Sequence, residues 1–315
     1  MERLDSELQW VFGFILALLL LSSVIGAALH WRVQSDAGRH TVQNLNARIR
    51  AWWLMVAAVG AAVLVGPLGA IGLFALLSFI ALREYLGISS TKRADHRALV
   101  YGFFVFLPVQ YALVAYDWYG LFSILIPVYA FLFLSLVSVL RGDPEDFLSR
   151  SARIQWGLMV CVYCVSHVPA LLMLDLKNYA GENIKLLLFL LLVAQLSDVL
   201  QYVFGKLLGR HKLAPVISPN KTIEGFVGGS LAAAGVGAAL YWITPFTPLQ
   251  AFVMALIIVL MGTVGGLVMS AIKRDRGVKD FGALISGHGG VLDRIDSLCF
   301  SAPVFFHLTR YFFSA

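Results

Sequence analysis

Charged residues are scarce in this sequence. Asp, Glu, Lys and Arg make up 13% of the 315 residues, whereas 59% are hydrophobic. An ordinary soluble domain has about 25% charged residues. The composition excludes a soluble enzyme, and it excludes a disordered chain, which would be poor in hydrophobic residues. We therefore predict an all-α, polytopic integral membrane protein with no separate soluble domain.

Cysteine is equally scarce. It occurs only at Cys161, Cys164 and Cys299, each within an apolar run, which excludes a secreted scaffold held together by disulfides. Cys161 and Cys164 form a CxxC pair followed by His167, but no second ligand pair has the spacing of a zinc site. We interpret these cysteines as buried helix residues rather than metal ligands.

The basic stretch of a cleaved signal peptide is also missing, because Arg3 lies among three acidic residues. We expect the first apolar run to be retained as a membrane span. Runs of about 17 to 25 residues, long enough to cross a bilayer, recur along the sequence. About ten helices are predicted, or nine if the Gly66-Pro67 break does not separate two spans. They cover residues 8–30, 51–66, 67–82, 98–115, 118–140, 154–174, 185–204, 226–243, 249–270 and 291–313.

Lys and Arg are distributed unevenly among the connections. If the N-terminus is outside, all of them except Arg3, Lys177, Lys185 and Arg310 fall on the cytoplasmic side. Cytoplasmic loops are enriched in these residues, so we expect this orientation in a multi-pass protein of the bacterial cytoplasmic (inner) membrane. The net charge of +6 then comes from Lys and Arg residues that line one face of the membrane. Anionic lipids are its expected partners, and no nucleic acid is expected.

Polar residues concentrate in the second half of the chain. We divide the protein into an N-terminal scaffold, residues 1–183, and a C-terminal part, residues 184–315, with catalytic loops at 205–225 and 271–296. Internal repeats and matched broken helices, which are typical of many transporters, are absent from the sequence.

Asp198 lies inside the predicted span 185–204. A carboxylate in such a position is unfavourable by roughly 2.5 to 3.5 kcal/mol, so it usually has a function. Eight positions separate it from Lys206, which places it about 12 Å below the cytoplasmic end of the helix. At this depth it can meet a lipid headgroup or phosphate.

The first catalytic loop ends with the segment 218–225, directly before a predicted helix. The hydroxyls of Ser218 and Thr222, the cation of Lys221 and the positive helix N-terminus suit a polyphosphate. Such residues also cap helices, although Thr222 to Gly225 lacks the spacing of a capping box.

The second catalytic loop combines cations, glycines and acids. Asp293 and Asp296 are spaced i, i+3, so they share a helix face, as two carboxylates that hold a divalent cation would. Gly289 and Gly290 beside His288 allow the backbone to approach a ligand closely. Membrane topology alone explains the basic residues, and a turn explains the glycines, but four acids within 22 residues exceed what topology requires.

These segments resemble the phosphatidate cytidylyltransferases, also called CDP-diacylglycerol synthases. That family's C-terminal signature is S-x-x-K-R-x(4)-K-D-x-G-x(2)-[LIF]-[PG]-x-H-G-G-x-x-D-R-x-D. It is matched by Ser270, Lys273, Arg274, Lys279, Asp280, Gly282, Ile285, His288, Gly289, Gly290, Asp293, Arg294 and Asp296. The family's S-P-x-K-T-x-E-G element is matched by Ser218, Pro219, Lys221, Thr222, Glu224 and Gly225, and its D-x-x-x-Y-x-x-G element by Asp198, Tyr202 and Gly205.

The similarity covers roughly residues 195 to 300, with two departures. Ser286 occupies a position that is usually Pro or Gly, and residues 199–202, including Gln201, replace a stretch of small residues after the aspartate. The second departure lies where a lipid would bind, so it leaves the acceptor lipid open.

The resemblance implies that CTP and phosphatidate react to give CDP-diacylglycerol and pyrophosphate in phospholipid biosynthesis. A phosphate monoester is mostly dianionic near neutral pH, so it can attack the α-phosphorus of CTP without a general base. The remaining task is to neutralise and align two polyanions with Mg²⁺, or another divalent cation, and with Lys and Arg. A homodimer is a further expectation of the family.

The resemblance also assigns roles to residues. Asp293 and Asp296 are expected to hold the metal, with Asp198 or Asp280 completing its ligands. Lys279, Asp280, His288 and Arg294 are expected to be catalytic. Residues expected to bind substrate are Ser218, Lys221, Thr222, Glu224, Lys273, Arg274, Gly289 and Gly290.

Three alternatives stay open. A paralogue could act on another lipid phosphate and still release pyrophosphate. A CTP-dependent polyprenol kinase would transfer the γ-phosphoryl group and release CDP. A membrane transporter would carry substrate without a metal requirement.

Overall fold

The computed structural model describes residues 6–32, 36–284 and 289–314. The protein is 81% helical, as the all-α prediction requires. In three predicted spans, 98–115, 118–140 and 154–174, the helix includes a π-helical turn. The elements up to residue 173 are α1 (Ser6–Arg32), α2 (Asp36–Val65), α3 (Pro67–Gly87), η1 (Arg93–Asp95), α4 (His96–Tyr101), η2 (Gly102–Phe106), α5 (Leu107–Ala115), α6 (Tyr119–Ile124), η3 (Leu125–Ala130), α7 (Phe131–Val139), α8 (Phe147–Leu158), η4 (Met159–Cys164), α9 (Val165–Ala170) and η5 (Leu171–Met173).

The C-terminal part is built from four long helices and one small hairpin. Its elements are α10 (Asn183–Leu208), β1 (Lys212–Ala214), β2 (Ser218–Thr222), α11 (Ile223–Ala239), η6 (Tyr241–Ile243), α12 (Pro248–Asp275) and α13 (Leu292–Phe313). The antiparallel hairpin β1–β2, in which Lys212 pairs with Thr222, was not predicted from the sequence. Its strands are short, and Pro219 interrupts any hydrophobic alternation.

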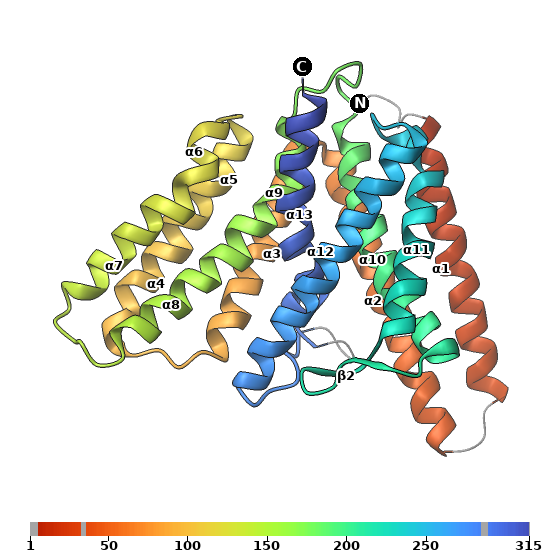
Figure 1. Cartoon of the computed structure of the whole chain (residues 1–315), viewed down its shortest axis with the longest axis horizontal. Coiled ribbons are helices and arrows are strands. Elements are labelled where there is room, and N and C mark those ends of the chain that lie inside the picture. Colours follow the sequence, from red (N-terminus) through yellow and green to blue (C-terminus); the bar gives the residue numbers. More distant parts are fainter. Residues whose placement is uncertain (1–5, 33–35, 285–288, 315) are drawn as a thin grey trace.

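All ten predicted helical segments are present in the described residues. Eight are long and apolar enough to cross a membrane. The other two are α11, which is shorter, and α13, which carries charged residues in its first turns. The two termini lie at one end of the bundle, and the β-hairpin lies at the other (Figure 1). The orientation of the bundle in the membrane stays a prediction.

The break at Gly66-Pro67 separates two helices. Gly66 has a φ of 93°, a conformation that favours glycine, and Pro67 begins α3. α2 and α3 run in opposite directions as a hairpin, with this turn at the end that carries the termini (Figure 1). Each of the two helices has a segment long and apolar enough to cross a membrane, so the break separates two candidate spans, while the total of ten spans stays a prediction. α3 continues to Gly87, five residues beyond the predicted end at 82.

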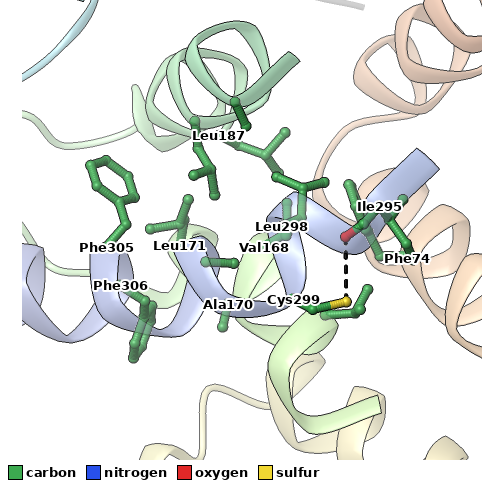
Figure 2. Packing of buried hydrophobic residues seen from close by; sticks show 14 of the residues in the cluster. Phe74, Val168, Ala170, Leu171, Leu187, Ile295, Leu298, Cys299, Phe305 and Phe306 are labelled. Carbon is green, nitrogen blue, oxygen red and sulfur yellow. Dashed lines mark hydrogen bonds between the residues drawn. The ribbon is translucent and has the colours of Figure 1, made fainter. Parts of the chain in front are cut away.

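The hydrophobic core surrounds α13. Ile295, Leu298 and Phe305 pack among residues of α3, α9 and α10 (Figure 2). Cys299 is also buried there and donates a hydrogen bond to the Ile295 carbonyl, 3.3 Å away. Cys161 is buried in the same core, so the prediction that these cysteines are packing residues is confirmed for both.

A buried ion pair links two connections at the end of the bundle where the β-hairpin lies. Arg150 on α8 is 2% exposed, and its Nε lies 3.0 Å from Asp95 Oδ1. The same guanidinium lies 3.1 Å from Asp143 Oδ2 and also donates to the Glu145 carbonyl. The Lys92 backbone N–H donates to the second oxygen of Asp95 at 2.9 Å. The network ties the η1 region to the α7–α8 connection.

Replacing Arg150 by methionine is expected to destabilise the protein. Breaking a buried pair by removing one partner typically costs about 3 to 5 kcal/mol, because the other charge is left buried. We expect a clear fall in the apparent Tm of the purified protein in detergent. The exposed Arg141 is the matched control, and Arg141→Met should leave the Tm unchanged. Equal Tm values for the two variants would contradict this role.

Candidate active site

The two predicted catalytic loops lie side by side at the hairpin end of the bundle. Arg274, at the end of α12, donates from Nε to the Ile217 carbonyl at 3.4 Å, which links it to the β-hairpin. Its Nη1 donates to the Val278 carbonyl of the following loop at 3.1 Å. Arg274 is otherwise exposed, so its charge is available to a ligand at the junction.

Asp293 holds the second loop in place. Its Oδ1 lies 2.6 Å from Lys273 Nζ, and both residues are less than 10% exposed. Its Oδ2 accepts hydrogen bonds from the backbone N–H groups of Phe281, at 2.8 Å, and Gly290, at 3.0 Å. Gly289 has a φ of 80°, and a β-carbon there would lie 2.9 Å from the same oxygen. Both carboxylate oxygens therefore bind groups of this chain.

Asp198, Asp296 and Lys221 come together from three elements. Asp296 interacts electrostatically with Asp198 of α10 and Lys221 of β2, and Lys221 also interacts with Asp198. Gly266 on α12 makes room for them, since a β-carbon there would lie 3.3 Å from Lys221 Nζ and 4.0 Å from Asp296 Oδ2. Asp198 is exposed although it lies in the middle of an apolar helix, and Asp296 is half-buried. The pair is accessible to a ligand.

Of the other predicted catalytic residues, Arg294 lies beside this pair. Arg294, in the first turn of α13, interacts electrostatically with Asp198, and its carbonyl accepts a hydrogen bond from Gln195 at 3.1 Å. Lys279 and Asp280 are exposed on the loop between α12 and α13. The prediction for His288 falls outside the described residues, as does the departure at Ser286.

Besides Lys221, three predicted substrate-binding residues belong to the β-hairpin and its junction with α11. Thr222 caps α11, because its hydroxyl accepts the Gly225 N–H at 3.1 Å. Glu224 accepts the backbone N–H groups of Arg210 and His211, at 3.0 and 3.1 Å, which ties the end of α10 to α11. Ser218 is half-buried in β2. The contacts of Thr222 and Glu224 stabilise the loop that presents Lys221, and their direct binding to substrate stays a prediction.

The second departure from the family motif is a contact between helices. Gln201 Nε2 donates to Thr263 Oγ1 at 2.9 Å, joining α10 to α12. A β-carbon on Gly229 would lie 2.5 Å from the Gln201 backbone, so α11 packs tightly against the same point. Gly229 and Gly225 are positions where α11 packs closely against α10, whereas Gly266 lies beside Lys221 and Asp296.

The donor set suits a magnesium ion, although the described residues contain no group of three His, Cys, Asp or Glu side chains placed to hold a metal. Mg²⁺ is commonly bound by one or two carboxylates together with substrate phosphates, instead of by a complete protein cage. Asp198 and Asp296 provide two such carboxylates. Asp293 has its oxygens engaged elsewhere, so its predicted role as a metal ligand stays a prediction.

Sequence reasoning missed one residue at this site. Glu84, near the end of α3, accepts hydrogen bonds from the backbone N–H groups of Val291 and Leu292, at 3.0 and 2.8 Å. The division of the chain at residue 183 stays a prediction, and this contact crosses it. An acid near the end of an apolar run was the available signal, but the predicted span ended at residue 82.

A carboxylate pair and several cations within an apolar helix bundle are what a membrane enzyme acting on phosphates requires, since such chemistry depends on positioning and charge neutralisation. Comparison with known proteins defines the class further. The chain belongs to the cytidylyltransferase family, whose model matches residues 46–312. It is a nucleotidyltransferase and a multi-pass membrane protein.

Individual relatives cover most of the chain. It is 42% identical to "Uncharacterized protein YnbB" of Escherichia coli (strain K12) over 302 residues, which is 94% of this chain and 96% of the relative. It is 32% identical over 238 residues to a phosphatidate cytidylyltransferase of Staphylococcus aureus (strain COL), covering 73% of this chain and 85% of the relative. The phosphatidate cytidylyltransferase of Staphylococcus saprophyticus is 32% identical over 237 residues with the same coverage.

Proposed function

We propose that this protein transfers the cytidylyl group of CTP to the phosphate of phosphatidate, forming CDP-diacylglycerol and releasing pyrophosphate. The observation that carries the proposal is the meeting of Lys221, Asp198 and Asp296 at an accessible site inside an apolar bundle. The similarity to phosphatidate cytidylyltransferases supports the same pair of substrates. Because CTP is a cytoplasmic metabolite, the proposal places the hairpin end on the cytoplasmic side.

In the proposed reaction, a phosphate oxygen of the lipid attacks the α-phosphorus of CTP, and the bond to the β-phosphate oxygen breaks. The dianionic phosphate needs no base to remove a proton. Lys221 and Arg274 neutralise the triphosphate and stabilise the leaving pyrophosphate. Mg²⁺ held by Asp198 and Asp296 would supply further neutralisation of the phosphates when bound. The ion pair between Asp293 and Lys273 joins the start of α13, which carries Asp296, to the end of α12, which carries Arg274.

The surface beside Asp198 suits an acceptor with acyl chains. Val199, Tyr202 and Val203 on α10 are 40 to 58% exposed and follow Asp198 directly along the helix. In a membrane this surface faces apolar chains, while the carboxylate faces the accessible site. A lipid can thus place its phosphate near the carboxylate pair without leaving the bilayer.

Release of pyrophosphate from CTP tests the proposal. The purified protein in detergent is expected to release pyrophosphate only when both phosphatidate and Mg²⁺ are present, and the nucleotide should be recovered on the lipid. Matched reactions lacking phosphatidate, or containing EDTA, are the controls. Pyrophosphate release with an isoprenoid phosphate but not with phosphatidate would contradict the proposed acceptor. Release of CDP would contradict cytidylyl transfer and indicate a kinase.

A further inference from the structure

α3, from the half of the chain that the family motifs do not cover, contributes a carboxylate to the active-site loop. Both oxygens of Glu84 accept backbone hydrogen bonds at the start of α13: Oε1 from Val291 at 3.0 Å, and Oε2 from Leu292 at 2.8 Å. The first N–H groups of a helix have no partner within the helix, and a negative charge beside them is favourable. No side chain of α13 itself provides this cap.

The loop is also shaped around this carboxylate. A β-carbon on Gly282 would lie 2.7 Å from Glu84 Oε1, and one on Gly290 would contact Glu84 Oε2. Neither glycine has a positive φ, so their backbone conformation does not require glycine. The Glu84 side chain occupies the space that a β-carbon would need, and this is a physical reason for glycine at both positions.

The neighbouring residue adds a second contact between α3 and the loop. The Tyr85 ring stacks on the Phe281 ring, with centroids 6.4 Å apart. Phe281 is buried, lies under the Lys273 ammonium, and donates its N–H to Asp293. α3 thus contacts the loop on both sides of the Asp293 carboxylate.

We infer that Glu84 is a positioning residue for catalysis: it fixes the start of α13 and so sets the positions of Asp293 and Asp296. It contacts no reacting group and acts through the backbone of Val291 and Leu292. The kinetic part of this inference rests on the proposed function. The structural part concerns only the hydrogen bonds of two amides, and it can be tested without substrate.

Hydrogen–deuterium exchange tests the structural part. In Glu84→Gln one of the two N–H groups faces an amide N–H₂, and in Glu84→Asp the shorter side chain withdraws the carboxylate. We expect the amides of Val291 and Leu292 to exchange about tenfold faster in both variants, the factor implied by losing a hydrogen bond to a charged group. Glu145→Gln, which removes an exposed acid paired with Lys92, should leave this exchange unchanged. Unchanged exchange in the Glu84 variants would overturn the inference.

Turnover tests the positioning part. We expect Glu84→Gln to lower kcat for pyrophosphate release about ten- to a hundredfold, as loss of supporting contacts to ligand residues commonly does. The KM for CTP should change less than about threefold, because Lys221 and Arg274 lie on other elements. An unchanged kcat would overturn the inference. Absence of turnover in the wild-type protein would contradict the proposed function alone, since the exchange result judges Glu84 separately.

A substitution at Gly282, made with and without the Glu84 carboxylate, tests the same inference sterically. Gly282→Ala places a methyl group against the Glu84 carboxylate, which cannot retreat without losing its two hydrogen bonds. We expect this variant to lose kcat about tenfold in the wild-type background. In the Glu84→Ala background the same substitution meets no carboxylate and should change kcat less than about twofold. Equal losses in both backgrounds would show that Gly282 does not act through Glu84 and would overturn this part of the inference.

Discussion

Asp293→Asn is expected to reduce kcat/KM for pyrophosphate release about a thousandfold. In the variant, an amide N–H₂ replaces one oxygen and faces an N–H donor, and Lys273 keeps its buried charge without a counterion. Breaking a buried pair from one side typically costs about 3 to 5 kcal/mol. If that free energy disfavours the arrangement in which Asp293 pairs with Lys273, the population in that arrangement falls about a thousandfold. Steady-state kinetics on the purified variant measures the loss.

Two further variants identify the cause of that loss. Asp275→Asn, which neutralises an exposed acid near the end of α12, is the matched control and should stay within about twofold of wild type. Lys273→Met in the Asp293→Asn background removes the stranded cation. We expect the double variant to be no less active than Asp293→Asn, since residues that act as a pair are not additive. Fully additive losses would contradict the anchoring role and favour direct metal binding by Asp293.

The positions of the helices could be predicted from the sequence because bilayer-length apolar runs dominate it. The ends of the helices could not be predicted in the same way. The apolar run of α3 stops before Arg83, yet the helix continues to Gly87, because a helix ends where its hydrogen bonding ends and not where it becomes polar. That difference of five residues hid Glu84. No local spacing relates Glu84 to Val291, 207 positions later.

The candidate site could be predicted as a set of residues but not as an arrangement. The i, i+3 spacing suggests that Asp293 and Asp296 act together, whereas the structure gives them different partners. Asp293 accepts hydrogen bonds from the loop, and Asp296 faces Asp198 and Lys221. Helical spacing fixes a shared face only within one helix. It does not show which neighbouring helix or loop supplies a donor, and that choice decides which carboxylate is available to a metal ion.

Asp296→Asn is expected to raise the Mg²⁺ concentration needed for half-maximal activity by about ten- to a hundredfold, and Asp198→Asn to do the same. Asp296 and Asp198 are like charges held close together, with Lys221 as their shared cation. A divalent cation relieves this repulsion more strongly than one lysine can, and an amide oxygen is a weaker ligand than a carboxylate. Titration of turnover with Mg²⁺ at saturating CTP and lipid measures the change.

Thermal unfolding separates metal binding from a structural role for the pair. A ligand present at a hundred times its Kd stabilises the folded state by about 2.7 kcal/mol, so Mg²⁺ together with CTP should raise the apparent Tm of the wild-type protein. In Asp296→Asn that increase should disappear, while the Tm without Mg²⁺ stays the same or rises, because a like-charge contact has been removed. Asp146→Asn, at an exposed position with a φ of 51° that asparagine tolerates, should keep the full increase. A fall in the metal-free Tm of Asp296→Asn with the Mg²⁺ increase intact would mean that the pair stabilises the bundle and that the divalent cation binds elsewhere.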